Sequence, residues 1–404
     1  MSARNVGSLF FPQRKVLQLG RETFSPGVHR KVVHAATETK SFQSAEKMLD
    51  VIGEITISGR HIGRLAQEAG QRLITQQRQR AVQHQARQLP VEVKNRPDLA
   101  VVEMDGGRIR TRQPGQGSGT HLPAWKETKN ALFMRMSSDV GEQDSCPDLP
   151  RFLQNRNKIR KLVLEMSGTA DGIEKFPEED FIAESSPRYV GPLRLMRTCL
   201  SSLDDVHTFG DLMAAEAHRK GFYQSPRQAF VADGMQCNWT TWKKHFPTFT
   251  PIVDFLHVVS YLYHAAVAVG GDEDFGWGMC LEWTEALWQG RAADVIAALK
   301  AWQQDQSPSE VEPGDDVLCD DDPCRVVQKT VTYLTNNLSR MNYPEYRQAG
   351  LPLTSSLMES LVKEMNWRVK GTEKFWNNPT GATPILALKA ASLSDDNRLE
   401  SVLT

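Results

Sequence analysis

The chain has 404 residues, of which 40% are hydrophobic and 24% charged, as is usual for a globular protein. This length predicts two or three domains. The formal net charge of −1 excludes binding of nucleic acid through an overall excess of positive charge, so any such binding must come from local patches.

The first periodic segments lie near the N-terminus. Apolar residues recur at helical spacing over 42–52 and again over 60–70, with a short interruption between them. Helix, short turn, helix is the outline of a helix-turn-helix unit, whose second helix enters the major groove of DNA. That second helix would present Arg60 and Arg64. The alternative is a plain helical hairpin that packs on the next domain.

Residues 71–96 are rich in Gln and Arg and poor in carboxylates. Such a stretch suits a helix or linker that follows phosphates, and equally a solvated helix face. We therefore predict that residues 1–96 form an N-terminal helical region that is a candidate for DNA binding.

The period then changes to that of strands. Short strand-like runs follow at 99–104, 130–137, 197–203, 228–232 and 251–255. An amphipathic helix at 209–220 lies between the third and fourth runs. Three strands, a helix, a strand, a helix and a strand make the connectivity of an RNase H-like core, which is an α/β fold with a mixed sheet. We expect this core over 97–255 and 351–404, with a helical insertion at 256–350.

Two acidic residues follow predicted strands. Asp105 and Asp233 each come directly after a short apolar run, and each precedes a glycine. Ligands bind at the C-terminal ends of strands in open α/β sheets, and a glycine lets a substrate approach the backbone closely. Asp-Gly is also a favoured hairpin turn. This alternative is stronger for Asp105, which lies between two strand-like runs, than for Asp233.

A third carboxylate lies on a predicted helix near the C-terminal end. Glu359, Lys363, Asn366 and Lys370 share one face of this helix, opposite an apolar stripe. A carboxylate beside lysines can bind a metal ion while the lysines contact phosphates. In the alternative, Ser356 and Glu359 form a capping box at the start of the helix.

Asp254 and His257 form an Asp-x-x-His pair next to the last predicted strand. Two ligands do not make a closed zinc site, so we expect a hydrogen-bonded structural pair beside an active site. Motifs for nucleotide binding, zinc proteolysis and serine hydrolysis are missing from the sequence.

The six cysteines include no C-x-x-C pair, which predicts neither a disulfide framework nor a zinc ribbon. The N-terminal segment has no apolar stretch of the signal-peptide kind, and no apolar run approaches the ~18 residues of a membrane span. These features predict a cytoplasmic chain with free thiols and no membrane partner.

Four passages together resemble DDE-type transposases of bacterial insertion sequences, in the group related to Mutator-like elements. In chain order they are VVEMDGGRIRTR, AWKETKNALF, VADGMQCNWTTWKKHFPTFTPIVDFLHVVSYLY and YPEYRQAGLPLTSSLMESLVKEMNWRVKGTEKFW. The resemblance implies a DDE transposase with an RNase H-like core, in which Asp105, Asp233 and Glu359 are the catalytic carboxylates and metal ligands. In some relatives the aspartate of the Asp-x-x-His motif, here Asp254, has been taken as the second ligand. The N-terminal zinc-ribbon cysteines of relatives are missing from this sequence.

The resemblance also implies what the enzyme uses and acts on. Two Mg²⁺ ions, or Mn²⁺, would support cleavage at element ends and attack of the freed 3′-hydroxyl on target DNA. The partners would be DNA and further copies of the chain, in the bacterial nucleoid. Two alternatives remain: a catalytically inactive or domesticated DNA-binding protein that keeps the fold, and a nuclease without strand transfer.

Overall fold

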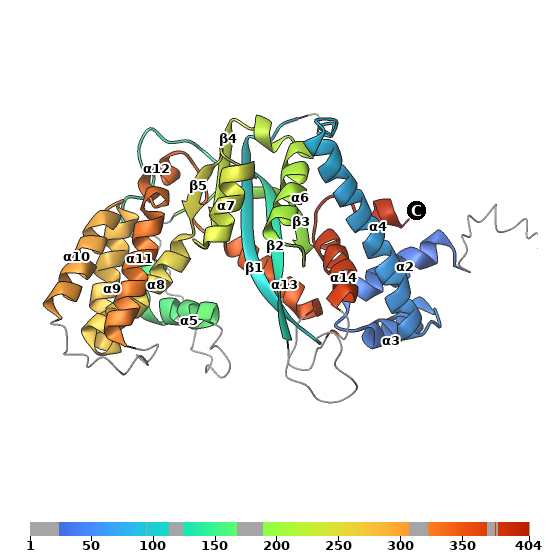
Figure 1. The fold of residues 1–404 in the computed structure, drawn as a ribbon, viewed down its shortest axis with the longest axis horizontal. Coiled ribbons are helices and arrows are strands. Elements are labelled where there is room, and N and C mark those ends of the chain that lie inside the picture. Colours follow the sequence, from blue (N-terminus) through green and yellow to red (C-terminus); the bar gives the residue numbers. More distant parts are fainter. Residues whose placement is uncertain are drawn as a thin grey trace, which may run out of the picture.

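A mixed sheet of five strands lies at the centre of the described structure (Figure 1). The computed structural model describes residues 24–93, 95–112, 124–167, 189–306, 322–369, 376 and 379–403. The strands are β1 (Leu99–Thr111), β2 (Ala124–Ser137), β3 (Leu193–Ser202), β4 (Arg227–Ala232) and β5 (Thr250–Val253). Their order is β3-β2-β1-β4-β5. The pairs β1–β2 and β2–β3 are antiparallel, whereas β1–β4 and β4–β5 are parallel. The predicted α/β class and the five predicted strands are therefore confirmed.

Helices occupy most of the remaining described chain. They are α2 (Pro26–Glu38), α3 (Phe42–Gly53), α4 (Gly59–Gln85), α5 (Arg156–Ser167), α6 (Val206–Arg219), α7 (Gln236–His245), α8 (Phe255–Gly270), α9 (Glu273–Trp288), α10 (Ala292–Asp305), α11 (Pro323–Asn337), α12 (Tyr343–Gln348), α13 (Ser356–Val369) and α14 (Pro379–Ser392). Short 3₁₀ turns are η1 (Arg151–Gln154), η2 (Phe222–Gln224), η3 (Leu338–Arg340) and η4 (Glu400–Val402). None of the described helices is long and apolar enough to cross a membrane.

The sheet differs from prediction at β1. This strand does not end before Asp105 but continues to Thr111, because its second half pairs with the first half of β2. Only the parallel pairing with β4 stops at Met104. Asp105 lies opposite Asn130 inside the antiparallel ladder, so the hairpin-turn alternative for Asp105 is wrong. Asp105 still lies where the parallel part of the sheet ends.

The N-terminal helices pack against the C-terminal part of the chain. Helix α4 lies alongside α14 and also contacts α6, as the blue and red ribbons in Figure 1 show. It buries a stripe of apolar side chains that includes Leu65, Ala66, Ala69 and Leu73. The polar stretch after Gly70 thus continues as helix to Gln85 because its few apolar residues extend this stripe.

The helices α8 to α12 form a second group beyond β5 (Figure 1). Phe255 packs edge-on against Trp288 and Tyr343, with ring centroids 5.2 and 4.9 Å apart. The hydroxyl of Tyr343 donates a hydrogen bond of 3.0 Å to the carbonyl of Val253, which joins α12 to β5. The described part of 256–350 is thus largely helical, as predicted. The division of the chain into four segments stays a prediction.

Candidate active site

Three aspartates lie where the parallel pairing of three neighbouring strands ends. Asp105, Asp233 and Asp254 each come directly after the last residue that its strand contributes to the parallel ladder of β1, β4 and β5. Because parallel strands end at the same edge of a sheet, the three residues share that edge. The peptide N–H of Asp254 donates a 2.9 Å hydrogen bond to the carbonyl of Ala232, which joins the ends of β4 and β5.

One cavity of about 690 Å³ lies at this edge. Asp105, Asp233, His257 and Glu359 all line it. Glu359 reaches it from the first turn of α13, a helix that packs against β1 and β2. The structure therefore brings the three predicted catalytic carboxylates to one cavity, although they lie far apart in the sequence.

Asp254 is fully buried and does not line the cavity. One carboxylate oxygen, Oδ1, accepts hydrogen bonds from the peptide N–H groups of Leu256 (2.7 Å) and His257 (3.2 Å) and caps α8. The other, Oδ2, accepts from the N–H of Ser355 (2.5 Å) and from its hydroxyl. These four donors use the lone pairs of the carboxylate, which leaves little capacity for a metal ion. This geometry favours Asp233 over Asp254 as the second ligand.

His257 lies beside Asp254, with its Nδ1 3.7 Å from Oδ1. Burial lowers the pKa of His257, but the carboxylate of Asp254 and the charges of Asp233 and Asp105 outweigh burial and raise it to about 9. Burial by itself raises the pKa of Asp254. The charge of His257 and the hydrogen bonds from His257 and Ser355 lower this pKa by more, so the net shift is downward. Both shifts favour a charged pair, and the structural role of this pair stays a prediction.

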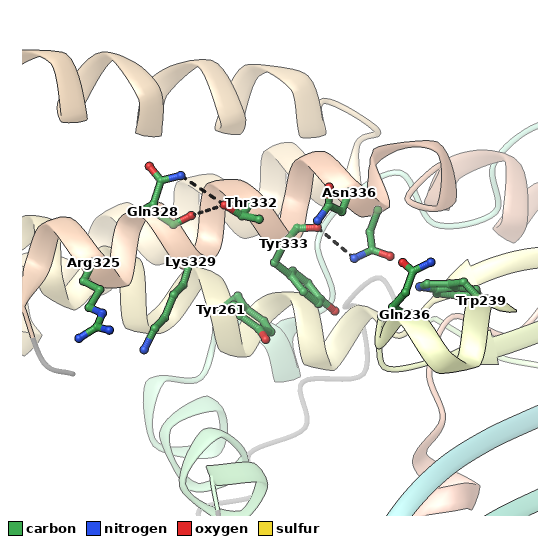
Figure 2. A pocket seen from close by; sticks show the side chains of 11 residues that line it. Gln236, Trp239, Tyr261, Arg325, Gln328, Lys329, Thr332, Tyr333 and Asn336 are labelled. Carbon is green, nitrogen blue, oxygen red and sulfur yellow. Dashed lines mark hydrogen bonds between the residues drawn. The ribbon is translucent and has the colours of Figure 1, made fainter. Parts of the chain in front are cut away.

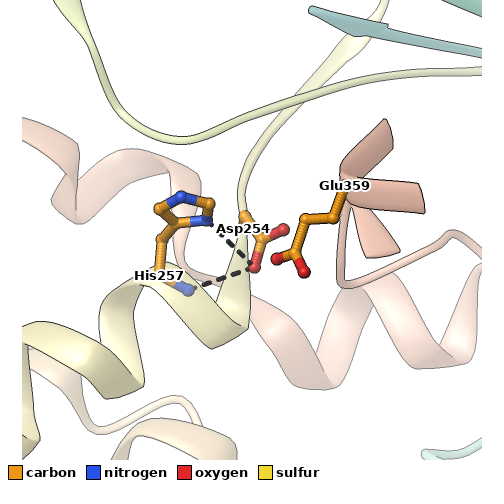
Figure 3. A group of neighbouring side chains, drawn as sticks. All are labelled: Asp254, His257 and Glu359. Atoms are coloured by element: carbon orange, nitrogen blue, oxygen red, sulfur yellow. Dashed lines mark hydrogen bonds and ion pairs between the residues drawn. The ribbon is translucent and has the colours of Figure 1, made fainter. Parts of the chain in front are cut away.

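The side chains of Asp254, His257 and Glu359 meet at one point (Figure 3). A ligand atom from each lies within 4.8 Å of the other two. This spacing alone would suit a metal ion. The hydrogen bonds from Ser355 to Asp254 also tie this cluster to the start of α13, next to the cavity.

Two carboxylates at the cavity have raised pKa values. Burial and the negative charge of Asp233 raise the pKa of Asp105 to about 6, against a weaker opposite effect of the Gly106 N–H. Burial and the charge of Asp254 raise the pKa of Glu359. The Oε1 atom of Glu359 is buried and has no hydrogen-bond partner. Such a constellation is typical of a functional site and accommodates a cation well.

The capping-box alternative for Glu359 is wrong. The N–H of Glu359 donates 3.0 Å to the carbonyl of Ser355, so Ser355, not Ser356, occupies the capping position. The hydroxyl of Ser355 is directed to Asp254 instead. Glu359 is therefore one position too far along the helix for a capping box, and its carboxylate faces the cavity.

The basic residues of the predicted DNA surface have different positions. Lys363 lines the cavity, is 65% exposed and forms a 2.8 Å ion pair with Glu165. Lys370 lies outside the described residues. Arg60 and Arg64 are exposed in the first turns of α4 and do not line the cavity; Arg64 contacts Glu68 on its own helix at 3.5 Å. The prediction that these two arginines bind DNA stays a prediction.

Sequence reasoning missed Glu103. This residue lies in β1, two positions before Asp105, and is 1% exposed. Burial and the charge of Asp254 raise its pKa well above the usual value, although the N–H of Met358 donates a hydrogen bond to it. Its Oε2 atom has no partner. A glutamate inside an otherwise apolar strand was the signal available in the sequence. Glu103 thus joins β1 to the first turn of α13 through its hydrogen bond from Met358.

No model of a known protein family matches this chain, and no curated protein sequence does. The case for a function therefore depends on the geometry of the cavity and on the sequence passages that surround it.

Proposed function

We propose that this chain is a metal-dependent phosphoryl-transfer enzyme of the DDE transposase type, which acts on DNA. The observation that carries the proposal is that Asp105, Asp233 and Glu359 line one cavity. They come from two adjacent parallel strands and one helix, in the order that the resemblance implies. The strand order β3-β2-β1-β4-β5, with its antiparallel and parallel halves, supports the RNase H-like assignment.

The same three residues would hold the metal ions. They supply carboxylate oxygens, which Mg²⁺ and Mn²⁺ prefer. The unpartnered Oε1 of Glu359 and the raised pKa of Asp105 both fit a place where a cation relieves carboxylate crowding. When bound, two such ions supply Lewis-acid polarisation of a phosphate oxygen and activation of the attacking water or hydroxyl.

Other side chains at the cavity can bind and orient a phosphodiester. His257 presents a protonated imidazole, which donates hydrogen bonds and offsets negative charge. Arg108 and Lys363 line the same cavity as exposed cations, on β1 and α13 respectively. Contacts of this kind fix the register of a nucleic-acid backbone and do not select its sequence. DNA ends and a homo-oligomer that pairs them are the partners that the resemblance supports.

Catalysis is tested with the full chain, Mg²⁺ or Mn²⁺, and labelled duplexes carrying the DNA that flanks its gene. A supercoiled plasmid serves as target. We expect cleavage of the duplex and joining to the plasmid. Asp105→Asn, Asp233→Asn and Glu359→Gln should each lower both rates by at least about 100-fold, since each removes a ligand and its negative charge.

The matched control is Glu127→Gln, which neutralises an exposed carboxylate at the same cavity without touching the triad. It should retain most of the activity. Binding without cleavage would indicate an inactive DNA-binding protein, and cleavage without joining a nuclease. Cleavage that persists in Asp233→Asn would overturn the assignment of the triad.

A further inference from the structure

A second pocket adjoins the cavity across a short segment of chain. The residues from 233 to 236 lead from the end of β4 into the first turn of α7, and they alternate between lining the cavity and lining the second pocket. Asp233 and Met235 line the cavity, whereas Gly234 and Gln236 line the second pocket. This pocket has a volume of about 550 Å³, within the ~300–1,000 Å³ that is usual for ligand sites. Only this short segment of chain thus separates the second pocket from the candidate catalytic carboxylates.

The walls of the pocket carry aromatic rings (Figure 2). The rings of Tyr261 and Tyr333 are stacked, with centroids 3.8 Å apart and planes 10° from parallel. Tyr261 is 37% exposed, so part of this stack remains open to solvent. Trp239 is buried and lines the same pocket from α7. Open aromatic surfaces are the usual platform on which unpaired bases stack.

The remaining lining of the pocket is polar. Gln236, Gln328 and Asn336 present amides, which both donate and accept hydrogen bonds. Arg325 and Lys329 line the outer part of the pocket along α11 (Figure 2). Of the described residues that line it, none is acidic. Rings, amides and basic groups together match a nucleotide, which has a flat base, polar base edges and an anionic phosphate.

The pocket is fixed rigidly to the cavity. The hydroxyl of Tyr333 donates a 2.8 Å hydrogen bond to the carbonyl of Asp233. Gly234 has a φ of +96°, and a Cβ atom there would lie 2.6 Å from the ring of Tyr333. Only glycine therefore allows the ring and the segment to approach this closely. The backbone of Asp233 and Gly234 therefore lies directly against the stack of Tyr261 and Tyr333.

We propose that this pocket binds an unpaired base of the DNA strand whose phosphate lies in the cavity. The inference rests on the proposed function, and it assigns the helical insertion a substrate-binding role through α8 and α11. A paired base offers only its edges, so a base must leave the duplex to stack on Tyr261. A nucleotide next to the reacting phosphate is close enough, because only the segment from 233 to 236 lies between.

The test uses single-stranded DNA oligonucleotides that contain 2-aminopurine, mixed with the full chain in EDTA so that no chemistry is needed. Stacking on Tyr261 should quench the fluorescence of the probe. Tyr261→Ala should weaken binding about tenfold, in the range found for one stacked base, and should abolish the quenching. Tyr261→Phe keeps the ring, and no hydrogen bond of the Tyr261 hydroxyl is present among the described residues, so this matched variant should bind and quench like the wild type.

A second variant guards against loss of structure. Gln236→Ala leaves the stacked rings intact and should weaken binding several-fold, with thermal unfolding as the check on folding of both variants. Unchanged affinity and quenching in Tyr261→Ala would overturn the inference, as would a wild type that binds without quenching. Asp105→Asn separates the two proposals: it should lose cleavage and keep the quenching. A wild type that binds no DNA would overturn both.

Discussion

The carboxylate of Asp254 accepts hydrogen bonds from both the backbone N–H and the hydroxyl of Ser355. It thereby joins the end of β5 to the start of α13, the helix that carries Glu359. Both residues are buried, at 0% and 5% exposure. The position of Glu359 therefore depends on a contact between segments that are distant in the sequence.

Ser355→Ala removes the hydroxyl, one of the four hydrogen-bond donors to the buried carboxylate of Asp254. We expect the free energy of unfolding to fall by about 1–3 kcal/mol, the usual cost of a lost hydrogen bond to a charged group. Cleavage should fall as well, because the first turn of α13 is held less firmly. Urea denaturation and the cleavage assay measure the two effects.

Ser356→Ala is the matched control for this change. Ser356 is exposed in the first turn of α13, so its loss should change stability by less than about 0.5 kcal/mol. Equal effects of the two substitutions would show that the contact between Ser355 and Asp254 does not position the helix.

The raised pKa of Asp105 predicts an unusual effect on stability. Its pKa is about 6 in the fold and 3.8 in the reference state, so the folded protein binds the proton more tightly. Ionisation of Asp105 therefore lowers the free energy of unfolding progressively as the pH rises from about 4 to 6. Above about pH 6 this reduction is constant. Asp105→Asn should be more stable than the wild type at pH 8 without metal, by up to about 3 kcal/mol.

Addition of Mg²⁺ or Mn²⁺ should make the wild type more stable than Asp105→Asn. A cation that binds the folded state raises the Tm of the wild type and of the Glu127→Gln control, but much less that of Asp105→Asn. Melting curves with metal and with EDTA at pH 8 measure the shifts. If metal raised the Tm of Asp105→Asn as much as that of the wild type, Asp105 would not be a ligand.

A buried cluster of charges predicts a second effect of pH. Glu216 of α6 contacts Arg219 and Arg398, each at 2.6 Å. Burial raises the pKa of Glu216, but the charges of Arg398 and Arg219 outweigh burial and lower it to about 2 from 4.5. The stabilisation by Glu216 is thus complete above pH 4.5 and is lost as the pH falls toward 2.

Glu216→Gln should lower the free energy of unfolding at pH 7 by about 3–5 kcal/mol, because it removes the buried negative charge that pairs with two buried arginines. The difference from the wild type should shrink below pH 4.5. Glu282→Gln, at an exposed position of α9, serves as control and should have little effect at any pH. Urea titrations at several pH values follow the trend; a difference that stays constant down to pH 3 would contradict it.

The sequence predicted the sheet better than the site. Apolar runs of short length located all five strands, because strand residues that are buried between layers form a continuous apolar run. The exact end of β1 was missed, since residues after Asp105 alternate polar and apolar and their partner strand is distant in the sequence. Local pattern alone does not reveal which residues a strand pairs with.

The roles of individual carboxylates were harder to predict. Glu359 was open to two interpretations, because Ser356 and Glu359 have the spacing of a capping box whether or not they form one. The choice was decided by Ser355 and Asp254, a contact across distant segments. Glu103 was missed because its importance comes entirely from burial, which is a property of the fold. Spacing identifies candidates, whereas the fold decides which of them share a cavity.

Helix α4 approaches α14 closely at Gly70. A Cβ atom at this position would lie 2.2 Å from the carbonyl oxygen of Pro384. Gly70→Ala therefore forces the two helices apart. The cost of such overpacking, about 1–3 kcal/mol, exceeds the gain of up to about 1 kcal/mol that alanine brings to a helix. We expect a lower Tm and a lower free energy of unfolding.

Gly278→Ala in α9 is the matched control, because a Cβ atom there meets nothing within 4 Å. This substitution should stabilise the protein by up to about 1 kcal/mol, since alanine favours a helix and restricts the unfolded chain. The two changes are chemically identical and are expected to act in opposite directions. If Gly70→Ala stabilised the protein as Gly278→Ala does, α4 and α14 would not pack against each other at this distance.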